Sequence, residues 1–178
     1  TIRIATRGSR LALWQAHAVS DRLRAAGART EVIVMTTTGD RSQLASIPGD
    51  DSKRQFVKEL EDALLRNDAD VAVHSAKDLP VALPEGLTVA ACLPREDARD
   101  GLVLPNCVGP VPLPDALARL GPRPVIGTGS VRRVAQLAPL LPDATFAPIR
   151  GNVDTRLAKL DAGGFSALVL ACAGLTRL

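Results

Sequence analysis

Short β-rich runs alternate with helical patterns along most of this chain, and that alternation limits its fold more than any other feature. In the first half, strands are expected at residues 2–5, 30–35 and 70–74, with helices at 9–26 and 53–66 between them. A strand, helix, strand, helix, strand order is typical of a parallel sheet covered by helices. The sequence therefore predicts the α/β class.

Individual segments support this prediction. Apolar residues recur at helical spacing across residues 13–23, with Ser9 placed to cap the helix start and Gly27 to end it. The run at 71–73 is apolar throughout, as in strands covered on both faces, so we expect it at the centre of the sheet. A further strand is expected at residues 87–91.

The second half repeats the alternation after a stretch rich in Pro and Gly. Helices are expected at residues 114–120, 130–141 and 154–162, and strands at 125–127, 145–149 and 167–171. The charged stretch 95–100 is the candidate crossing point between two domains, at 1–95 and 96–178, with the last residues returning toward the first domain. Ligands in open α/β sheets bind beyond the carboxyl ends of the strands, which predicts a cleft between the domains.

Composition excludes several classes of protein. The 22 basic and 19 acidic residues give a net charge of +3, which is too small a surplus to indicate nucleic-acid binding. No apolar run approaches the roughly 18 residues that span a bilayer, and no signal peptide opens the chain. We therefore expect a cytoplasmic protein without membrane or nucleic-acid partners. We also expect a monomer, although no feature of the composition specifies the oligomeric state.

Cysteine usage argues against a disulfide framework and against a zinc site. Cys92, Cys107 and Cys172 are widely spaced, and none of them forms a CxxC pair. A reducing compartment is the simplest inference. No metal site is expected.

Loops with cationic or hydroxyl side chains follow the predicted strands. They occupy residues 6–9, 37–40, 75–78, 128–133 and 150–152. Glycines in these loops let the backbone approach a ligand, and Ser9 and Ser130 are placed to cap the helices that follow. The loops are therefore expected to bind anions.

Arginines in the second-half loops indicate the kind of anion. Arg132, Arg133 and Arg150 each offer a planar fork that matches a carboxylate or phosphate, and several together favour a ligand with several acidic groups. The alternative is that these arginines form a solvated face or pair with Asp and Glu side chains of the protein. The residues alone leave both interpretations open.

Asp78 is the candidate for acid-base chemistry. It follows an apolar strand and His74, and it lies beside Lys77, so its carboxylate is expected at the cleft mouth, where it could transfer a proton or stabilise a positive intermediate. The alternative is a turn-initiating Asp before Leu79 and Pro80. We expect a structural role for His74. The chain contains no Walker A, G-x-G-x-x-G, G-x-S-x-G or H-E-x-x-H motif.

Several stretches resemble porphobilinogen deaminases. They are IATRGS with LALWQA near the start, TGD at 38–40, FVKELE at 56–61, DVAVHSAKDLP at 70–80, RED at 95–97, SVRR at 130–133, and RGNV with TRL at 150–157. The resemblance runs from one end of the chain to the other. It implies a fold like that of periplasmic binding proteins, with two domains and hinge strands.

The resemblance also implies an activity. Porphobilinogen deaminases, which are hydroxymethylbilane synthases, join four porphobilinogen molecules with loss of ammonia into linear hydroxymethylbilane for tetrapyrrole synthesis. By the same resemblance Asp78 is the catalytic carboxylate. Substrate and cofactor contacts fall on Arg7, Ser9, Lys53, Lys77, Thr128, Ser130, Arg132, Arg133, Arg150, Gly151 and Arg156.

Three departures from the family pattern affect these expectations. Residues 49–55 retain Lys53 but add Asp50 and Asp51 where many relatives are rich in glycine, and Gly129 replaces a serine. Relatives continue into a third domain, whose cysteine holds a dipyrromethane cofactor, and we expect this chain to lack both. Two alternatives therefore remain: a non-catalytic module that binds polycarboxylates or other small anions, and a two-part enzyme that needs a separate third-domain chain.

Overall fold

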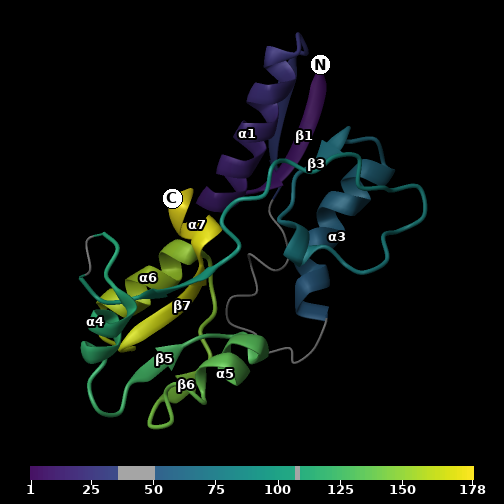
Figure 1. Ribbon diagram of the computed structural model, residues 1–178. Helices are drawn as coiled ribbons and strands as arrows, with labels where there is room; N and C mark the ends of the chain where they lie inside the picture. The colour runs from purple at the N-terminus through teal and green to yellow at the C-terminus, as the bar shows by residue number, and fades with distance from the viewer. Residues whose placement is uncertain (36–50, 107–108) are drawn as a thin grey trace. The chain divides into compact units, whose positions relative to one another are not determined.

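A computed structural model describes residues 1–35, 51–106 and 109–178, with side chains omitted from 51–56. The chain divides into two compact units, unit 1 at Thr1–Pro94 and unit 2 at Arg95–Leu178 (Figure 1). Each unit has its own sheet.

Unit 1 is a three-stranded parallel sheet with helices. Its elements are β1 (Ile2–Arg7), α1 (Arg10–Ala25), β2 (Thr30–Met35), α3 (Asp51–Leu65), β3 (Val71–Ala72) and the short 3₁₀ helix η1 (Ala76–Asp78). The strand order is β2-β1-β3, and both neighbours of β1 run parallel to it. The predicted βαβαβ order is confirmed, because parallel neighbours need a crossover of this kind.

The ends of α1 form where the sequence predicted them. The Ser9 hydroxyl oxygen accepts a hydrogen bond from the Ala12 backbone N–H at 3.3 Å, which caps the helix start. At the other end Gly27 has φ of 88°, and the N–H of Ala28 donates to the Leu23 carbonyl. This left-handed glycine closes the helix as a Schellman motif. The apolar face of α1 contributes Ala16, which is fully buried.

Two predictions for unit 1 are wrong. Among the strands of the described residues, the 71–73 run is at the edge of the sheet, and β1, with Ile4 and Ala5 fully buried, is at the centre. An apolar run marks burial, and it does not fix a strand's place in the sheet. The expected strand at 87–91 does not form, and Val89 within it is exposed. Within the described residues it has no neighbouring strand to pair with.

Unit 2 is a mixed four-stranded sheet. Its elements are β4 (Asp100–Val103), α4 (Leu113–Ala118), β5 (Val125–Gly127), α5 (Val131–Leu137), β6 (Thr145–Ala147), α6 (Val153–Asp161), β7 (Ala167–Ala171) and α7 (Cys172–Thr176). The strand order is β4-β7-β5-β6. β5 runs parallel to β6 and β7, and β4 runs antiparallel to β7. Figure 1 shows α6 beside β7.

The sequence interpretation missed β4. Asp100 and Gly101 open this strand, and both residue types are depleted in strands because neither packs well on a pleated surface. Pairing with β7 overrides that preference. The charged stretch at 95–100 therefore ends in a strand of unit 2.

The core of unit 2 is aliphatic and tightly packed. Ile126 and Leu168 are fully buried, and Leu160 is 1% exposed. Gly127 lies directly against this core. A Cβ atom added there would lie 2.4 Å from Cδ2 of Leu168, which is too close for two non-bonded carbon atoms, so one of them would have to shift. Across the described residues, no helix is long and apolar enough to cross a bilayer.

Candidate functional site

The predicted site residues of unit 1 follow two neighbouring strands. β1 ends at Arg7, and β3 leads through His74 into η1, which contains Lys77 and Asp78. Because β1 and β3 run parallel, their carboxyl ends lie at the same edge of the sheet. Unit 1 therefore brings the predicted catalytic carboxylate and a predicted cationic ligand contact to one edge.

His74 lies within electrostatic reach of both groups. Burial lowers the pKa of His74 below its usual 6.5, the Arg7 charge lowers it further, and the Asp78 carboxylate acts in the opposite direction. Burial and a neighbouring cation both disfavour the imidazolium form. His74 is therefore neutral near pH 7.

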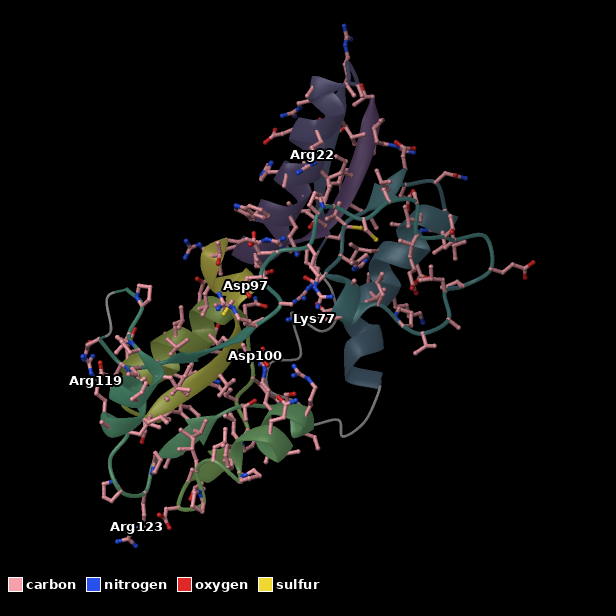
Figure 2. The ribbon with its side chains drawn as sticks, in the orientation of Figure 1. Arg22, Lys77, Asp97, Asp100, Arg119 and Arg123 are labelled. Atoms are coloured by element: carbon pink, nitrogen blue, oxygen red, sulfur yellow. The ribbon has the colours of Figure 1, made fainter. Side chains whose placement is uncertain are left out.

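Residues preceding Asp78 are tied to α1. The Gln15 side-chain amide donates to the Ser75 hydroxyl at 2.9 Å, and the Asp78 backbone N–H donates to the Ser75 carbonyl at 2.9 Å. Asp78 is half-buried, and Lys77, which is labelled in Figure 2, is exposed. The segment that carries Asp78 is thus fixed by hydrogen bonds on both sides of Ala76.

The lowered pKa of His74 predicts a pH effect on stability. Between its lowered native pKa and 6.5, the unfolded chain binds more protons than the native one, so stability falls as pH falls through this window. His74→Gln should flatten that dependence, measured as the melting temperature from pH 8 to pH 5. The matched control is His17→Gln, on the exposed surface of α1, which should melt with the wild-type pH profile. An unchanged profile for His74→Gln would contradict the prediction.

In unit 2 the turn after β5 presents two hydroxyl groups. Thr128 is 4% exposed, and its Oγ1 accepts a hydrogen bond from the Ser130 N–H at 3.2 Å. The Ser130 hydroxyl oxygen in turn accepts from the Arg133 N–H at 3.4 Å and caps α5, as predicted. An oxygen that accepts from a helix N–H keeps its own O–H to donate. The half-buried Ser130 can therefore still bind an anion.

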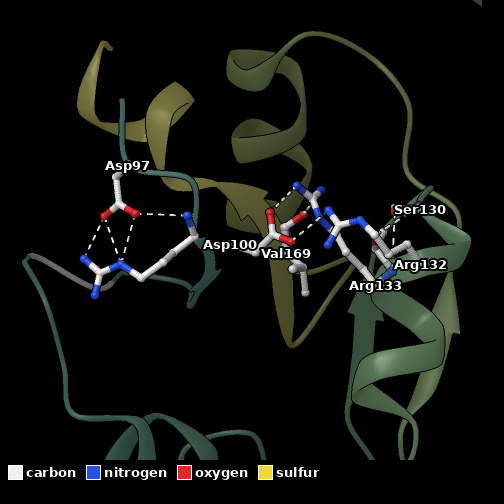
Figure 3. Close-up of polar contacts among 8 residues, drawn as sticks. Asp97, Asp100, Ser130, Arg132, Arg133 and Val169 are labelled. Carbon is white, nitrogen blue, oxygen red and sulfur yellow. Dashed lines mark hydrogen bonds and ion pairs between the residues drawn. The ribbon is translucent and has the colours of Figure 1, made fainter. Parts of the chain in front are cut away.

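Arg132 and Arg133 differ in their surroundings, although they are adjacent. Arg133 is 14% exposed, and its guanidinium donates to the Val169 carbonyl at 2.9 Å and to Asp100 at 2.6 Å. Arg132 is 62% exposed and donates to the other carboxylate oxygen of Asp100 at 3.2 Å. Figure 3 shows both arginines converging on Asp100. The two guanidinium groups lower the pKa of Asp100 below its usual 3.8.

The Arg150 and Gly151 loop is held from α6. Nε of Arg156 donates to the Gly151 carbonyl at 2.7 Å, and Nζ of Lys159 donates to the Arg150 carbonyl at 3.2 Å. Gly151 has φ of 111°, and a Cβ there would lie 2.9 Å from the Thr155 methyl group. Only glycine fits this turn without strain. The Arg150 side chain is exposed.

Unit 2 thus gathers its predicted residues at one edge as well. β5 and β6 are parallel neighbours, so the turns that begin at Thr128 and Ile149 follow the same edge of the sheet. Figure 2 shows Arg123, which precedes β5, at the other end of the unit from Asp100. Not every arginine of unit 2 therefore belongs to this edge.

Some predicted residues lie outside the described part. The Lys53 backbone is in the first turn of α3, but its side chain is outside the description, as is the 37–40 loop. Cys92 is exposed and Cys172 is half-buried, and both are free thiols. Within the described ranges, no group of three His, Cys, Asp or Glu side chains is placed to hold a metal ion.

The sequence interpretation missed Asp100 and Gln15 as site residues. In the sequence, Asp100 is only one of the charged residues at 95–100. Its ion pairs with Arg132 and Arg133 would have identified it, but they depend on how β4 pairs with β7. Gln15 lies on a helix face, and only its hydrogen bond to Ser75 singles it out. Both are contacts between residues far apart in the sequence.

Comparison with known proteins gives a consistent result over the whole chain. Residues 2–178 match the family model described as porphobilinogen deaminase, dipyromethane cofactor binding domain. The porphobilinogen deaminase of Stenotrophomonas maltophilia is 51% identical over 180 residues, and that of Albidiferax ferrireducens is 47% identical over 178 residues, each covering 100% of the chain. The chain spans 57% and 54% of the length of these two relatives. It belongs to the porphobilinogen deaminase family.

Proposed function

We propose that this chain carries the substrate-binding and catalytic side chains of a hydroxymethylbilane synthase. The reaction is the stepwise joining of four porphobilinogen molecules, with loss of ammonia, into linear hydroxymethylbilane. The observation that carries the proposal is the identity of about one residue in two to porphobilinogen deaminases along the entire chain. The cationic and hydroxyl groups at both sheet edges support it.

The substrate explains the choice of side chains. Each porphobilinogen carries an acetate and a propionate group, so a growing pyrrole chain gains two carboxylates with every ring added. Arg132 and Arg150 are exposed and can donate paired hydrogen bonds to such groups. Ser130 adds a neutral donor, and Lys77 adds an exposed point charge. Arg7, Ser9, Lys53, Thr128, Gly151 and Arg156 complete the proposed set of contacts.

The same donors fit a dipyrromethane cofactor. The matched family model is the cofactor-binding domain, and two linked pyrroles carry four carboxylates, which suits a set of arginines and hydroxyls. Nε of Arg133 is buried and has no hydrogen-bond partner among the described residues, which leaves one donor of this set unused. Dipyrromethane supplies, when bound, the pyrrole to which the first substrate is joined. Its attachment cysteine, expected in a third domain, stays a prediction.

Asp78 has the catalytic role in this proposal. In each cycle the aminomethyl C–N bond of porphobilinogen breaks and ammonia leaves, so the substrate becomes a cation. A C–C bond then forms to the free α-carbon of the terminal pyrrole, which loses its proton. A carboxylate beside the pyrrole nitrogens stabilises the cation and assists the proton transfer. The Asp78 carboxylate, which raises the pKa of His74 against the effect of burial, supports this role with a charge at the same edge of the sheet.

The proposal also includes the domain boundaries, the cellular location, the oligomeric state and the partners. We propose domains at residues 1–95 and 96–178, a cytoplasmic location, and a monomer that uses neither nucleic acid nor membrane. The small net charge of +3 supports the lack of nucleic-acid binding. The predicted cleft concerns the mutual placement of the domains and stays a prediction.

A turnover assay on the protein expressed from its complete gene tests the function. We expect porphobilinogen consumption with release of one ammonia per molecule, and an intact mass that includes a covalently held dipyrrole. Binding of porphobilinogen without turnover would instead support the non-catalytic polycarboxylate module. Lack of binding would reject both.

Arg132 provides a test of carboxylate binding. Arg132→Leu removes charge-assisted hydrogen bonds, so porphobilinogen should bind about 1.5–3 kcal/mol more weakly, measured by isothermal titration. The matched control is Arg123→Leu, an exposed arginine before β5, at the opposite end of unit 2. It should bind like wild type. Equal loss in both variants would mean that Arg132 acts only through the overall charge.

A further inference from the structure

Asp100 lies at the ligand edge of unit 2 because β4 runs against its neighbour. In the antiparallel register Asp100 pairs with Ala171, the last residue of β7. The amino end of β4 therefore meets the carboxyl end of β7. β7 runs parallel to β5, so this is also the edge from which the Thr128 turn emerges. Asp100 therefore places a carboxylate at the edge of the unit 2 sheet where the predicted cationic ligand contacts lie.

The two arginines depend on Asp100 to different degrees. Arg133 has a second anchor, since its guanidinium also donates to the Val169 carbonyl, and it is 14% exposed. For the 62% exposed Arg132, the charged hydrogen bond to Asp100 is the only hydrogen bond or ion pair of its side chain within the described residues (Figure 3). Removing the carboxylate would leave Arg133 in place and release Arg132. The effect of Asp100 therefore falls mainly on Arg132.

We propose that Asp100 is a positioning residue that holds the Arg132 guanidinium ready for a carboxylate ligand. A long, free side chain loses rotamer freedom when it binds, and a side chain that is already held loses less. Asp100 takes one N–H of Arg132 and leaves the others to donate. Its effect on ligand affinity rests on the proposed function, whereas its effect on Arg132 does not.

The negative charge of Asp100 acts in the opposite direction, because it repels an anionic ligand. That repulsion acts through solvent at a half-exposed edge and is screened within about 3 Å at 1 M salt. Positioning is a local contact that salt weakens much less. Comparing variants at low and high salt therefore separates the two effects, and the positioning effect should persist at high salt.

The first experiment needs no substrate. Phenylglyoxal modifies arginine side chains, and peptide mass spectrometry gives the rate at each position. Asp100→Asn should raise the labelling rate of Arg132 several-fold and leave Arg123 unchanged. Asp97→Asn is the matched control, because Asp97 lies in the same charged stretch and pairs with Arg99 at 2.7 Å. An unchanged rate at Arg132 in Asp100→Asn would overturn the proposal.

The second experiment measures the consequence for binding. Asp100→Asn should weaken porphobilinogen binding about 3- to 10-fold at high salt, as expected for one side chain that must be ordered anew. The loss should be smaller at low salt, where the substitution also removes an unscreened repulsion. In an Arg132→Leu background the same change should have almost no effect, and a merely structural role would not show this dependence. At high salt, tighter binding, or equal loss in both backgrounds, would refute positioning. If the wild type fails to bind porphobilinogen, the proposed function fails, and the labelling rates still decide the role of Asp100.

Discussion

Asp78→Asn should lower porphobilinogen turnover by about 10²- to 10⁴-fold, the usual contribution of a positioned acid-base group. The amide has nearly the same shape, but it carries no charge to stabilise a cation and accepts no proton. Because Asp78 is half-buried and its backbone N–H, which the change retains, donates to Ser75, folding should be nearly unaffected. Steady-state kinetics with porphobilinogen give the turnover, and thermal melting checks the fold.

Asp68→Asn is the matched control. Asp68 is an exposed carboxylate that pairs with Arg66 and precedes β3, whereas Asp78 follows it. Turnover of Asp68→Asn should equal that of wild type, because exposed ion pairs contribute little. If Asp78→Asn also turns over normally, Asp78 is only a turn residue. That was the alternative which the sequence left open.

Gly127→Ala should destabilise unit 2 by about 3 kcal/mol, at the upper end of the usual cost of overpacking. The new Cβ would lie 2.4 Å from Leu168 and 2.9 Å from Phe165. Leu168 is fully buried, so it cannot move aside into solvent. Urea denaturation measures the loss as a lower midpoint at an unchanged slope.

Gly129→Ala is the control for this prediction, two residues further along the chain, in the turn that follows β5. Its Cβ would lie 3.4 Å from the Ile149 carbonyl oxygen, close to ordinary contact, and Gly129 is exposed. The midpoint for Gly129→Ala should therefore stay near that of wild type. A similar loss in both variants would locate the effect in turn flexibility and would contradict the packing argument.

Local signals explain most of what the sequence predicted about the fold. The α/β class is confirmed in both units, and β2, β5 and β7 have the predicted bounds. The cap at Ser9 and the left-handed Gly27 fix α1 through contacts within a few residues, which a sequence displays directly. The family's periplasmic-binding-protein-like fold agrees with this architecture.

Features set by distant contacts were not predictable. β4 opens with Asp100 and Gly101 and forms only because β7 is there to pair with. The 71–73 run is apolar, yet its place at the sheet edge follows from the strand order. For the site, the residue types indicated an anion, but the different surroundings of Arg132 and Arg133 depend on where Asp100 lies. The sequence interpretation named both arginines without distinguishing them.

The short β4 strand also makes the charge balance of unit 2 sensitive to insertions and deletions. Successive side chains in a strand point to opposite faces, so a shift of one residue against β7 would turn Asp100 away from its present face and bring a neighbour into its position. Both neighbours, Arg99 and Gly101, lack a carboxylate. A frame-preserving loss of one codon within β4 would then leave two cations without their shared counter-charge, although every residue that binds ligand would still be encoded.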